Sequence, residues 1–175
     1  MSEIAGRLAM QIGTTLLHQH NGGRGLMLGG LPSADRGHVV VIGAGSVGLN
    51  AVAAALGARV TVFDIRRESH IRANALGPNV TSLPAYGDLI AEAVSDADLV
   101  VGAVLVPGAK AHRSVTEAVV RGMKPGSVIA DVSVDQGGCV ESIHPTTYED
   151  PTYVLHGVVH FGVTNLPGAV PTTSS

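Results

Sequence analysis

The chain has 175 residues, of which 45% are hydrophobic and 14% charged, a composition that fits one globular domain and excludes a disordered chain. The formal net charge of −3 gives no reason to expect a nucleic-acid partner, and no apolar run reaches the roughly 18 residues of a membrane span. The N-terminus lacks a signal-peptide pattern, and a single cysteine cannot form an internal disulfide. We therefore expect a cytoplasmic protein without a membrane span.

The first predicted element is a helix over residues 2 to about 20, because apolar residues four apart share one of its faces. Ser2 is a candidate N-cap, and the glycines at 22–23 are a stop signal. We treat residues 1–24 as a connecting helix and turn, and residues 25–175 as the following domain. The apolar face comprises Ile4, Leu8, Ile12 and Leu16.

Strands and helices then alternate to the end of the chain. The strand segments are near-continuous runs of Val, Ile and Leu, which is typical of strands buried on both faces of a parallel sheet. This alternation predicts an α/β fold of the Rossmann type, a doubly wound parallel sheet with an N-terminal connecting helix. The expected strands are 38–42, 59–64, 79–83, 98–104, 126–133 and one within 154–163; the expected helices are 49–58, 66–76, 88–97 and 110–123.

A glycine-rich loop joins the first expected strand to a helix. Its sequence fits G-x-G-x-x-G, and an acidic residue ends the next strand, which is the context of a dinucleotide-binding loop. Gly43 would allow the tight turn, Gly45 would let a pyrophosphate approach the backbone, and Gly48 would let helix and strand pack closely. The helix N-terminus would supply free N–H groups to the phosphates. The predicted loop residues are Gly43, Ala44, Gly45, Ser46, Val47 and Gly48.

Asp64 is the acidic residue at the end of the second strand. Its carboxylate would accept hydrogen bonds from the adenosine ribose hydroxyls and repel a 2′-phosphate, which favours NAD over NADP. Arg66 and Arg67 follow it and leave NADP open. The plain alternative is a glycine turn in an α/β protein that binds no dinucleotide.

Three later motifs follow the expected strands: "GAVLVPGAKA", "KPGSVIADVSVDQGG" and "HPTTYEDPTYVLHGVVHFGVTNLPGAVPTTSS". With the glycine loop, they resemble the alanine dehydrogenase family closely, and the NAD-binding subunit of proton-translocating transhydrogenase less closely. The resemblance covers essentially all of the chain. Family members have an NAD domain and a discontinuous substrate domain, and this sequence matches only the NAD domain and the helix before it. We therefore expect a fragment that lacks the substrate domain.

The resemblance implies an NAD-dependent oxidation of L-alanine with water to pyruvate and ammonia, and a homo-oligomer, often a hexamer. It gives Asp135 a catalytic role, as a buried carboxylate that orients the substrate or the attacking water. It also implies further cofactor contacts along the dinucleotide, from the first helix to the nicotinamide end. These are Ser2, Val104, Leu105, Val134, Asp135, Val163, Thr164, Asn165 and Leu166.

Non-catalytic or purely structural roles remain as alternatives for the chain and for several of these residues. The chain could be a standalone NAD(H)-binding module without turnover, as the transhydrogenase resemblance allows, and Asp135 could be a turn residue. His156 and His160 would lie about 13 Å apart on one strand, too far for a shared metal ion, so no metal site is expected. Cys139 is interpreted as a packed small residue, since no activating base is identifiable near it in the sequence.

Overall fold

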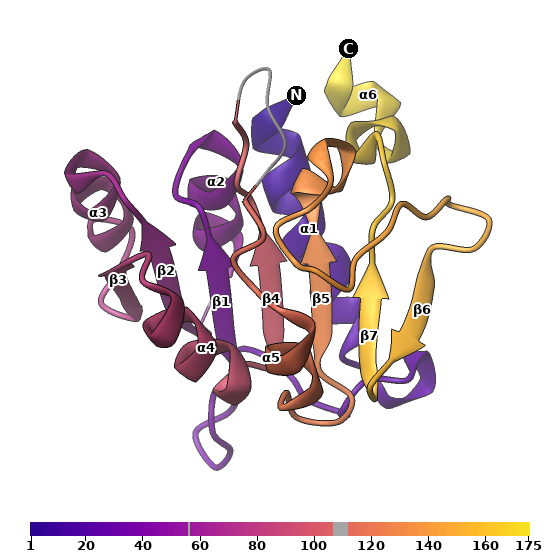
Figure 1. Ribbon diagram of the computed structural model, residues 1–175, viewed down its shortest axis with the longest axis horizontal. Helices are drawn as coiled ribbons and strands as arrows, with labels where there is room; N and C mark the ends of the chain where they lie inside the picture. The colour runs from indigo at the N-terminus through magenta and orange to yellow at the C-terminus, as the bar shows by residue number, and fades with distance from the viewer. Residues whose placement is uncertain (56, 107–111) are drawn as a thin grey trace.

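A seven-stranded sheet forms the centre of the computed structural model, which describes residues 1–55, 57–106 and 112–175. The strands are β1 (His38–Ile42), β2 (Arg59–Asp64), β3 (Val80–Pro84), β4 (Leu99–Gly102), β5 (Val128–Asp131), β6 (Thr152–Leu155) and β7 (Val158–Phe161). Their order is β3-β2-β1-β4-β5-β7-β6, and only the edge strand β6 runs antiparallel to its neighbour (Figure 1). The six parallel strands follow the Rossmann order, which confirms the predicted fold.

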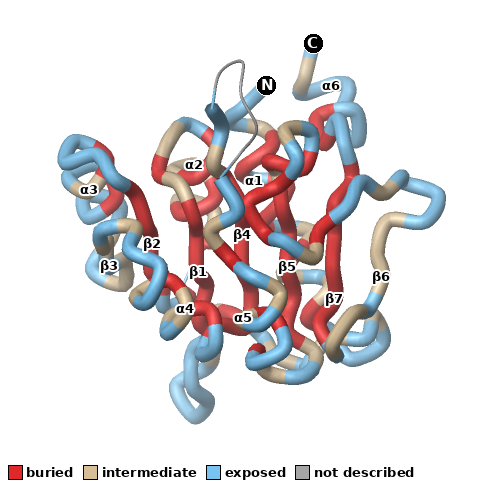
Figure 2. Tube along the Cα trace, in the orientation of Figure 1, coloured by how far each residue is buried: buried red, intermediate tan, exposed pale blue. Residues whose placement is uncertain are grey.

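Helices cover both faces of the sheet. Successive strand residues point to opposite faces, so Val39 and Val41 belong to one core cluster and Val40 and Ile42 to the other. Figure 2 shows the resulting buried strands at the centre of the molecule. The helices are α1 (Ser2–Leu16), α2 (Ser46–Ala54), α3 (Arg67–Asn74), α4 (Gly87–Asp96), α5 (Glu117–Arg121) and α6 (Pro171–Ser174), with the short 3-10 helices η1 (Gln19–Asn21), η2 (Val132–Gln136) and η3 (Leu166–Ala169).

Helix α1 is packed into the first core cluster and against α2. Ala9 and Met10 of α1 are almost fully buried there. At Gly6 the two helices are so close that an added Cβ would lie 2.1 Å from the carbonyl oxygen of Val47. The absence of a side chain at Gly6 therefore sets how closely α1 lies on the helix that follows the glycine loop. The division of the chain at residue 24 remains a prediction.

Several predicted elements differ from the structure at their ends; for example, α2 covers Ser46–Ala54 rather than 49–58, and β5 covers Val128–Asp131 rather than 126–133. The helix α1 stops at Leu16 rather than near residue 20, and Met1 is its N-cap, so the prediction of Ser2 as N-cap is wrong. The helix expected over 110–123 covers only Glu117–Arg121, and residues 110–111 lie outside the described part. The reason is a tertiary pairing: Val115 forms a parallel bridge with Val140, which requires extended backbone just before the helix.

The last predicted strand is a hairpin of β6 and β7. His156 lies in its turn, with a φ of +55°, so the prediction that His156 and His160 share a strand is wrong. His156 pairs with Glu117, whereas His160 is fully buried in β7. Among the described residues, no group of three or more His, Cys, Asp or Glu could hold a metal ion. Nor does this part of the chain contain a helix long and apolar enough to cross a membrane.

Candidate functional site

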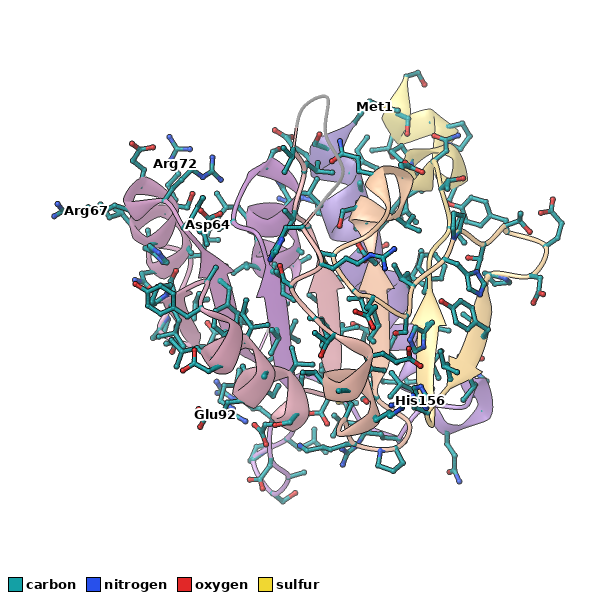
Figure 3. The ribbon with its side chains drawn as sticks, viewed as in Figure 1. Met1, Asp64, Arg67, Arg72, Glu92 and His156 are labelled. Carbon is teal, nitrogen blue, oxygen red and sulfur yellow. The ribbon has the colours of Figure 1, made fainter. Side chains whose placement is uncertain are left out.

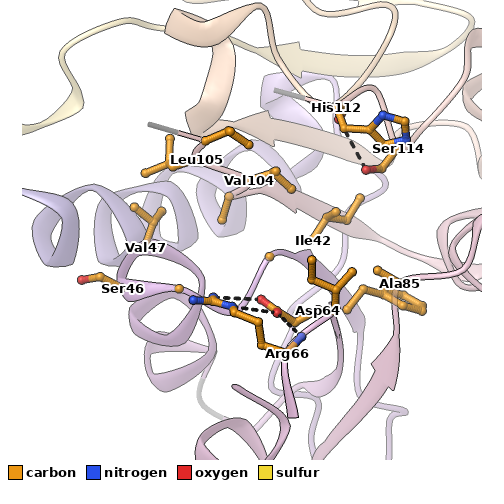
Figure 4. Close-up of a pocket in the computed structure, with 16 residues that line it drawn as sticks. Ile42, Ser46, Val47, Asp64, Arg66, Ala85, Val104, Leu105, His112 and Ser114 are labelled. Atoms are coloured by element: carbon orange, nitrogen blue, oxygen red, sulfur yellow. Dashed lines mark hydrogen bonds and ion pairs between the residues drawn. The ribbon is translucent and has the colours of Figure 1, made fainter. Parts of the chain in front are cut away.

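A pocket of about 540 Å³ lies at the carboxyl ends of β1, β2 and β4 (Figure 4). The strand order reverses between β1 and β4, and ligands of doubly wound sheets bind in the crevice at such a point. The pocket therefore lies where the fold predicts a ligand. Its lining residues are Ile42, Gly43, Gly45, Ser46, Val47, Phe63, Asp64, Ile65, Arg66, Ala85, Ala103, Val104, Leu105, Val106, His112 and Ser114.

The three glycines of the motif differ in how much room the structure leaves for a side chain. Gly43 has a φ of +97°, and a Cβ there would lie 2.6 Å from the Ala103 carbonyl oxygen, while a Cβ at Gly48 would lie 1.7 Å from the Gly43 carbonyl oxygen. Gly45 has an ordinary φ of −79°, and among the described residues only the Arg66 Nη2 atom, 3.8 Å away, comes within 4 Å of its added Cβ. The protein's own packing thus requires glycine at Gly43 and Gly48 but leaves open space in front of Gly45. A ligand that approaches the backbone would use that space.

The start of α2 supplies donors at the same place. Gly45 is the helix N-cap, and among the described residues no side chain caps this helix. The first N–H groups of a helix have no partner within the helix, and the helix dipole favours an anion beside them. This donor set and the room at Gly45 fit the pyrophosphate of a dinucleotide.

Asp64 lines the pocket beside the glycine loop. Its carboxylate is buried, with 7% exposed surface, and accepts hydrogen bonds from the backbone N–H of Ala44 at 2.7 Å and of Arg66 at 2.8 Å. The Arg66 guanidinium adds contacts of 3.1 Å from Nε and 3.2 Å from Nη2. Burial alone would raise the pKa of Asp64, but the hydrogen bonds from Arg66 and Ala44 outweigh it and the pKa is lowered. Asp64 is therefore an anion at neutral pH.

The pocket lining includes residues that were predicted from the sequence and others that were not. Val104 and Leu105 line the pocket as expected, whereas Arg66, His112 and Ser114 were not predicted as lining residues. Arg66 could have been found from its position two residues after Asp64. His112 and Ser114 gave no local signal, because they reach the pocket only through the path of the chain after residues 107–111, which lie outside the described part.

The segment after β5 is organised by Asp131. This fully buried carboxylate accepts hydrogen bonds from the Ser133 N–H and hydroxyl through Oδ1, and from the N–H groups of Cys139 and Val140 through Oδ2. Burial raises the pKa of Asp131, and these hydrogen bonds oppose the rise. Asp131 was not among the predicted site residues, since an aspartate inside an expected strand gives no sign that it closes the following loop.

Asp135 lies in η2, four residues beyond the end of β5, and its side chain is exposed. The expectations that it is buried and that it closes the strand are therefore wrong for this chain. Within residues 132–140 no N–H group is hydrogen-bonded to Asp135, because Asp131 takes that role. The observation weakens the interpretation of Asp135 as a turn residue.

Other predicted contact residues lie at the same edge of the sheet but outside this pocket. Figure 1 shows the start of α1, the segment after β5 and η3 gathered at the ends to which the strand arrows point. A hydrogen bond of 2.9 Å from the Val106 N–H to Gln136 Oε1 joins the pocket wall to η2. Val134, Val163 and Leu166 are buried, Ser2, Thr164 and Asn165 are exposed, and Ala44 and Gly48 are buried in the glycine loop.

Cys139 is fully buried beside Asp131. Burial and the nearby Asp131 charge raise the pKa of its thiol well above the usual value. A thiol that stays protonated is a poor nucleophile. The environment agrees with the interpretation of Cys139 as a packing residue.

Comparisons with known proteins agree with this architecture. The family model described as "Alanine dehydrogenase/PNT, C-terminal domain" matches residues 9–175. The whole chain is 51% identical to the alanine dehydrogenase of Geobacillus stearothermophilus and 50% identical to that of Bacillus subtilis (strain 168), and covers 48% and 47% of them. The chain thus spans about half the length of the curated relatives it matches.

Two solved structures show the same similarity in three dimensions. An L-alanine dehydrogenase superimposes with a TM-score of 0.96 at 50% identity, over 99% of this chain and 49% of the other. A transhydrogenase from Sinorhizobium meliloti superimposes with a TM-score of 0.82 at 26% identity, over 99% of this chain and 51% of the other. With its fold, its glycine loop and these similarities together, the chain belongs to the alanine dehydrogenase/PNT C-terminal domain family.

Proposed function

We propose that this chain is the NAD(H)-binding half of an NAD-dependent L-alanine dehydrogenase. The observation that carries the proposal is the open space in front of Gly45, between the uncapped start of α2 and the anionic Asp64. The first N–H groups of α2 would hold the pyrophosphate, and Asp64 would bind the adenosine ribose. The carboxylate favours NAD(H) over NADP(H), because it repels a 2′-phosphate.

The rest of the dinucleotide would extend across the carboxyl edge of the sheet. Val104 and Leu105 line the pocket on the β4 side, and Val106 is tied to η2 through Gln136. Val134 and Asp135, together with the segment from Val163 to Leu166 and Ser2 of α1, would then approach the nicotinamide end. When bound, NAD would supply the hydride acceptor for the oxidation of L-alanine at Cα, and hydrolysis by water would complete the conversion to pyruvate, ammonium, NADH and a proton.

Asp135 is the proposed catalytic residue of this half. Its exposed carboxylate is not used by the N–H groups of its own loop, so it is available to orient the amino acid or the attacking water. The substrate-binding side chains would come from the half that this chain does not span. A homo-oligomer, a hexamer by family resemblance, and a cytoplasmic location belong to the same proposal.

A direct test is the titration of the purified chain with NADH, followed by the fluorescence of the reduced nicotinamide. We expect Gly45→Ala to weaken NADH binding at least tenfold, about 1.4 kcal/mol, because the new methyl group occupies the space of the ligand. Its melting temperature should stay near that of the wild type. Gly122→Ala is the matched control, since its Cβ also has room and lies at the end of α5 away from the pocket. Equal NADH affinity in Gly45→Ala and wild type would contradict the proposal.

The proposed activity and the role of Asp135 in it need a separate test. The purified chain with L-alanine and NAD should produce no pyruvate, whereas replacing the matching part of the Geobacillus stearothermophilus relative with this chain, so that the rest of that relative is kept, should give turnover. In that protein we expect Asp135→Asn to lower turnover about 100-fold, or ~2.7 kcal/mol, with unchanged folding. Normal turnover of this variant would remove Asp135 from the mechanism.

The transhydrogenase neighbour supports a second candidate, a standalone NAD(H)-binding module. This candidate predicts the same NADH binding and the same effect of Gly45→Ala. It differs in the hybrid of this chain and the relative, where it predicts no pyruvate. The pyruvate assay therefore separates the two.

A further inference from the structure

The Asp64 carboxylate is shared between the pocket and a neighbouring cation. Each of its oxygens accepts one backbone N–H and one guanidinium N–H: Oδ1 from the Arg66 N–H and Nε, and Oδ2 from the Ala44 N–H and Arg66 Nη2. A carboxylate offers about four acceptor sites. The four donors fill them, so ribose hydroxyls can bind Asp64 only if the Arg66 side chain moves away.

The Arg66 guanidinium itself lies inside the binding pocket. It is one of the lining residues, its Nη2 atom is the group that faces Gly45, and its side chain is 57% exposed (Figure 4). An arginine offers five N–H donors, and the contacts with Asp64 use two of them. The remaining donors are available to an anion in the pocket, and a phosphate is the anion that guanidinium groups bind best.

These two facts act in the same direction on cofactor choice. NADH loses the exposed ion pair between Arg66 and Asp64 before its ribose can use the carboxylate. NADPH can keep the guanidinium between the Asp64 carboxylate and its own 2′-phosphate, so the repulsion between the two anions is offset. The preference for NADH that Asp64 alone would produce is therefore reduced.

We propose that Arg66 is the residue that sets the selectivity of this pocket, and that it holds the preference for NADH over NADPH to a small factor. The inference rests on the proposed function, because it concerns the adenosine end of the same dinucleotide site. It is a separate claim, since the first N–H groups of α2 would hold the pyrophosphate whether or not Arg66 favours NADPH.

Arg67 supplies a matched control. It is the next residue and carries the same charge, but it starts α3, and Figure 3 shows its side chain directed away from Asp64. Arg66→Met and Arg67→Met lower the net charge of the chain by the same amount. A difference between the two variants therefore reports the position of the guanidinium rather than the overall charge.

The experiment is a titration of the wild type and both variants with NADH and NADPH, and with the adenosine fragments 5′-AMP and 2′,5′-ADP. In the wild type we expect NADPH to bind within about tenfold of NADH. Arg66→Met should raise the ratio of the NADPH to the NADH dissociation constant at least tenfold, chiefly by weakening NADPH, and the fragments should show the same change. Arg67→Met should change the ratio less than about threefold.

The wild-type ratio should also depend on salt. The contacts of Arg66 with a phosphate are partly exposed, so added salt should weaken NADPH binding more than NADH binding in the wild type. Arg66→Met should lack this excess salt dependence.

The outcomes that would overturn the inference are distinct. An unchanged ratio in Arg66→Met, with NADH still bound, would overturn the role of Arg66 and leave the proposed function intact. A wild-type preference for NADH of more than about 100-fold would also overturn it. A wild type that binds neither dinucleotide would overturn the proposed function and this inference together.

Discussion

The strands β2 and β5 both end in a buried aspartate, yet the two carboxylates do different work. Asp64 faces the pocket and shares its charge with the exposed Arg66 side chain. Asp131 faces inward and accepts its hydrogen bonds from Ser133, Cys139 and Val140. One carboxylate can exchange its partners for a ligand, while the other holds a loop in a fixed shape.

The difference shows that the residue type at a strand end does not decide its role. Asp64 is followed by a residue whose cationic side chain folds back onto it, and its pKa is lowered. Asp131 receives hydrogen bonds from neutral donors up to nine residues away, and burial raises its pKa. The direction of each pKa shift therefore follows the class of partner as well as the depth of burial.

The largest effect is expected at the inward-facing carboxylate. In Asp131→Asn the amide NH2 faces either the N–H groups of Cys139 and Val140 or the N–H and hydroxyl of Ser133. Only the hydroxyl can turn to accept from it, so at least one buried N–H group loses its acceptor in either orientation, and an unsatisfied buried donor costs about 1–3 kcal/mol. We expect a loss of about 3 kcal/mol in unfolding free energy at pH 7, or a melting temperature lower by roughly 6–12 °C. Urea and thermal unfolding measure both quantities.

The control for this variant lies in the same loop. Asp135→Asn makes the same chemical change at an exposed carboxylate that its loop does not use, so its stability should stay within about 0.5 kcal/mol of the wild type. If both variants lose the same stability, the organising role of Asp131 is wrong.

A smaller loss is expected at the pocket-facing carboxylate. In Asp64→Asn the carbonyl oxygen can still accept the Ala44 N–H, and the lost partner, Arg66, is half exposed. We expect about 1 kcal/mol of destabilisation and roughly tenfold weaker NADH binding, measured by urea unfolding and by fluorescence titration. Asp35→Asn, at an exposed loop position, should change neither. A loss of stability as large as that of Asp131→Asn would show that the two carboxylates contribute equally to the stability of the fold, against this expectation.

The pH dependence of stability is the smallest expected effect and has opposite signs at the two sites. Asp64 has a lowered pKa, so its contribution is present above the unfolded-state pKa of about 3.9 and is lost as the pH falls through the folded-state pKa. Asp131 has a raised pKa, so its titration favours the folded state below about pH 3.9, and that contribution is lost as the pH rises through the folded-state pKa.

Urea unfolding from pH 3 to 7 tests these signs. The stability difference between wild type and Asp64→Asn should shrink toward pH 3, and that between wild type and Asp131→Asn should shrink toward pH 7. Differences that change in the same direction would show that the two carboxylates titrate alike.

The sequence predicted what depends on periodicity and on backbone freedom. The central strands β1, β2, β4 and β5, the helices that alternate with them and the geometry of the glycine loop were predicted correctly, because a parallel sheet needs continuous apolar runs and Gly43 and Gly48 have no room for a side chain. The local sequence was therefore enough to identify the glycine loop and Asp64, both of which contribute to the pocket lining.

The sequence did not predict what depends on contacts between distant segments. The bridge between Val115 and Val140 shortens the helix that became α5, and no local pattern near Val115 indicates it. Asp131 reads as an ordinary strand residue until Cys139 and Val140 are brought back to it. Both the bridge and the hydrogen bonds of Asp131 form only because the tertiary fold brings Cys139 and Val140 next to β5 and the start of α5.

The packing of α1 has a consequence for the order in which the chain can fold during synthesis. Helix α1 lies against β5 and η3, which are made more than 100 residues after it. Until Leu166 has left the ribosome, the apolar face of α1 lacks part of its native cover, although α2 and Val47 are already available to it. Contacts so distant in sequence form late, and we expect this domain to stay incompletely folded until η3 has been made.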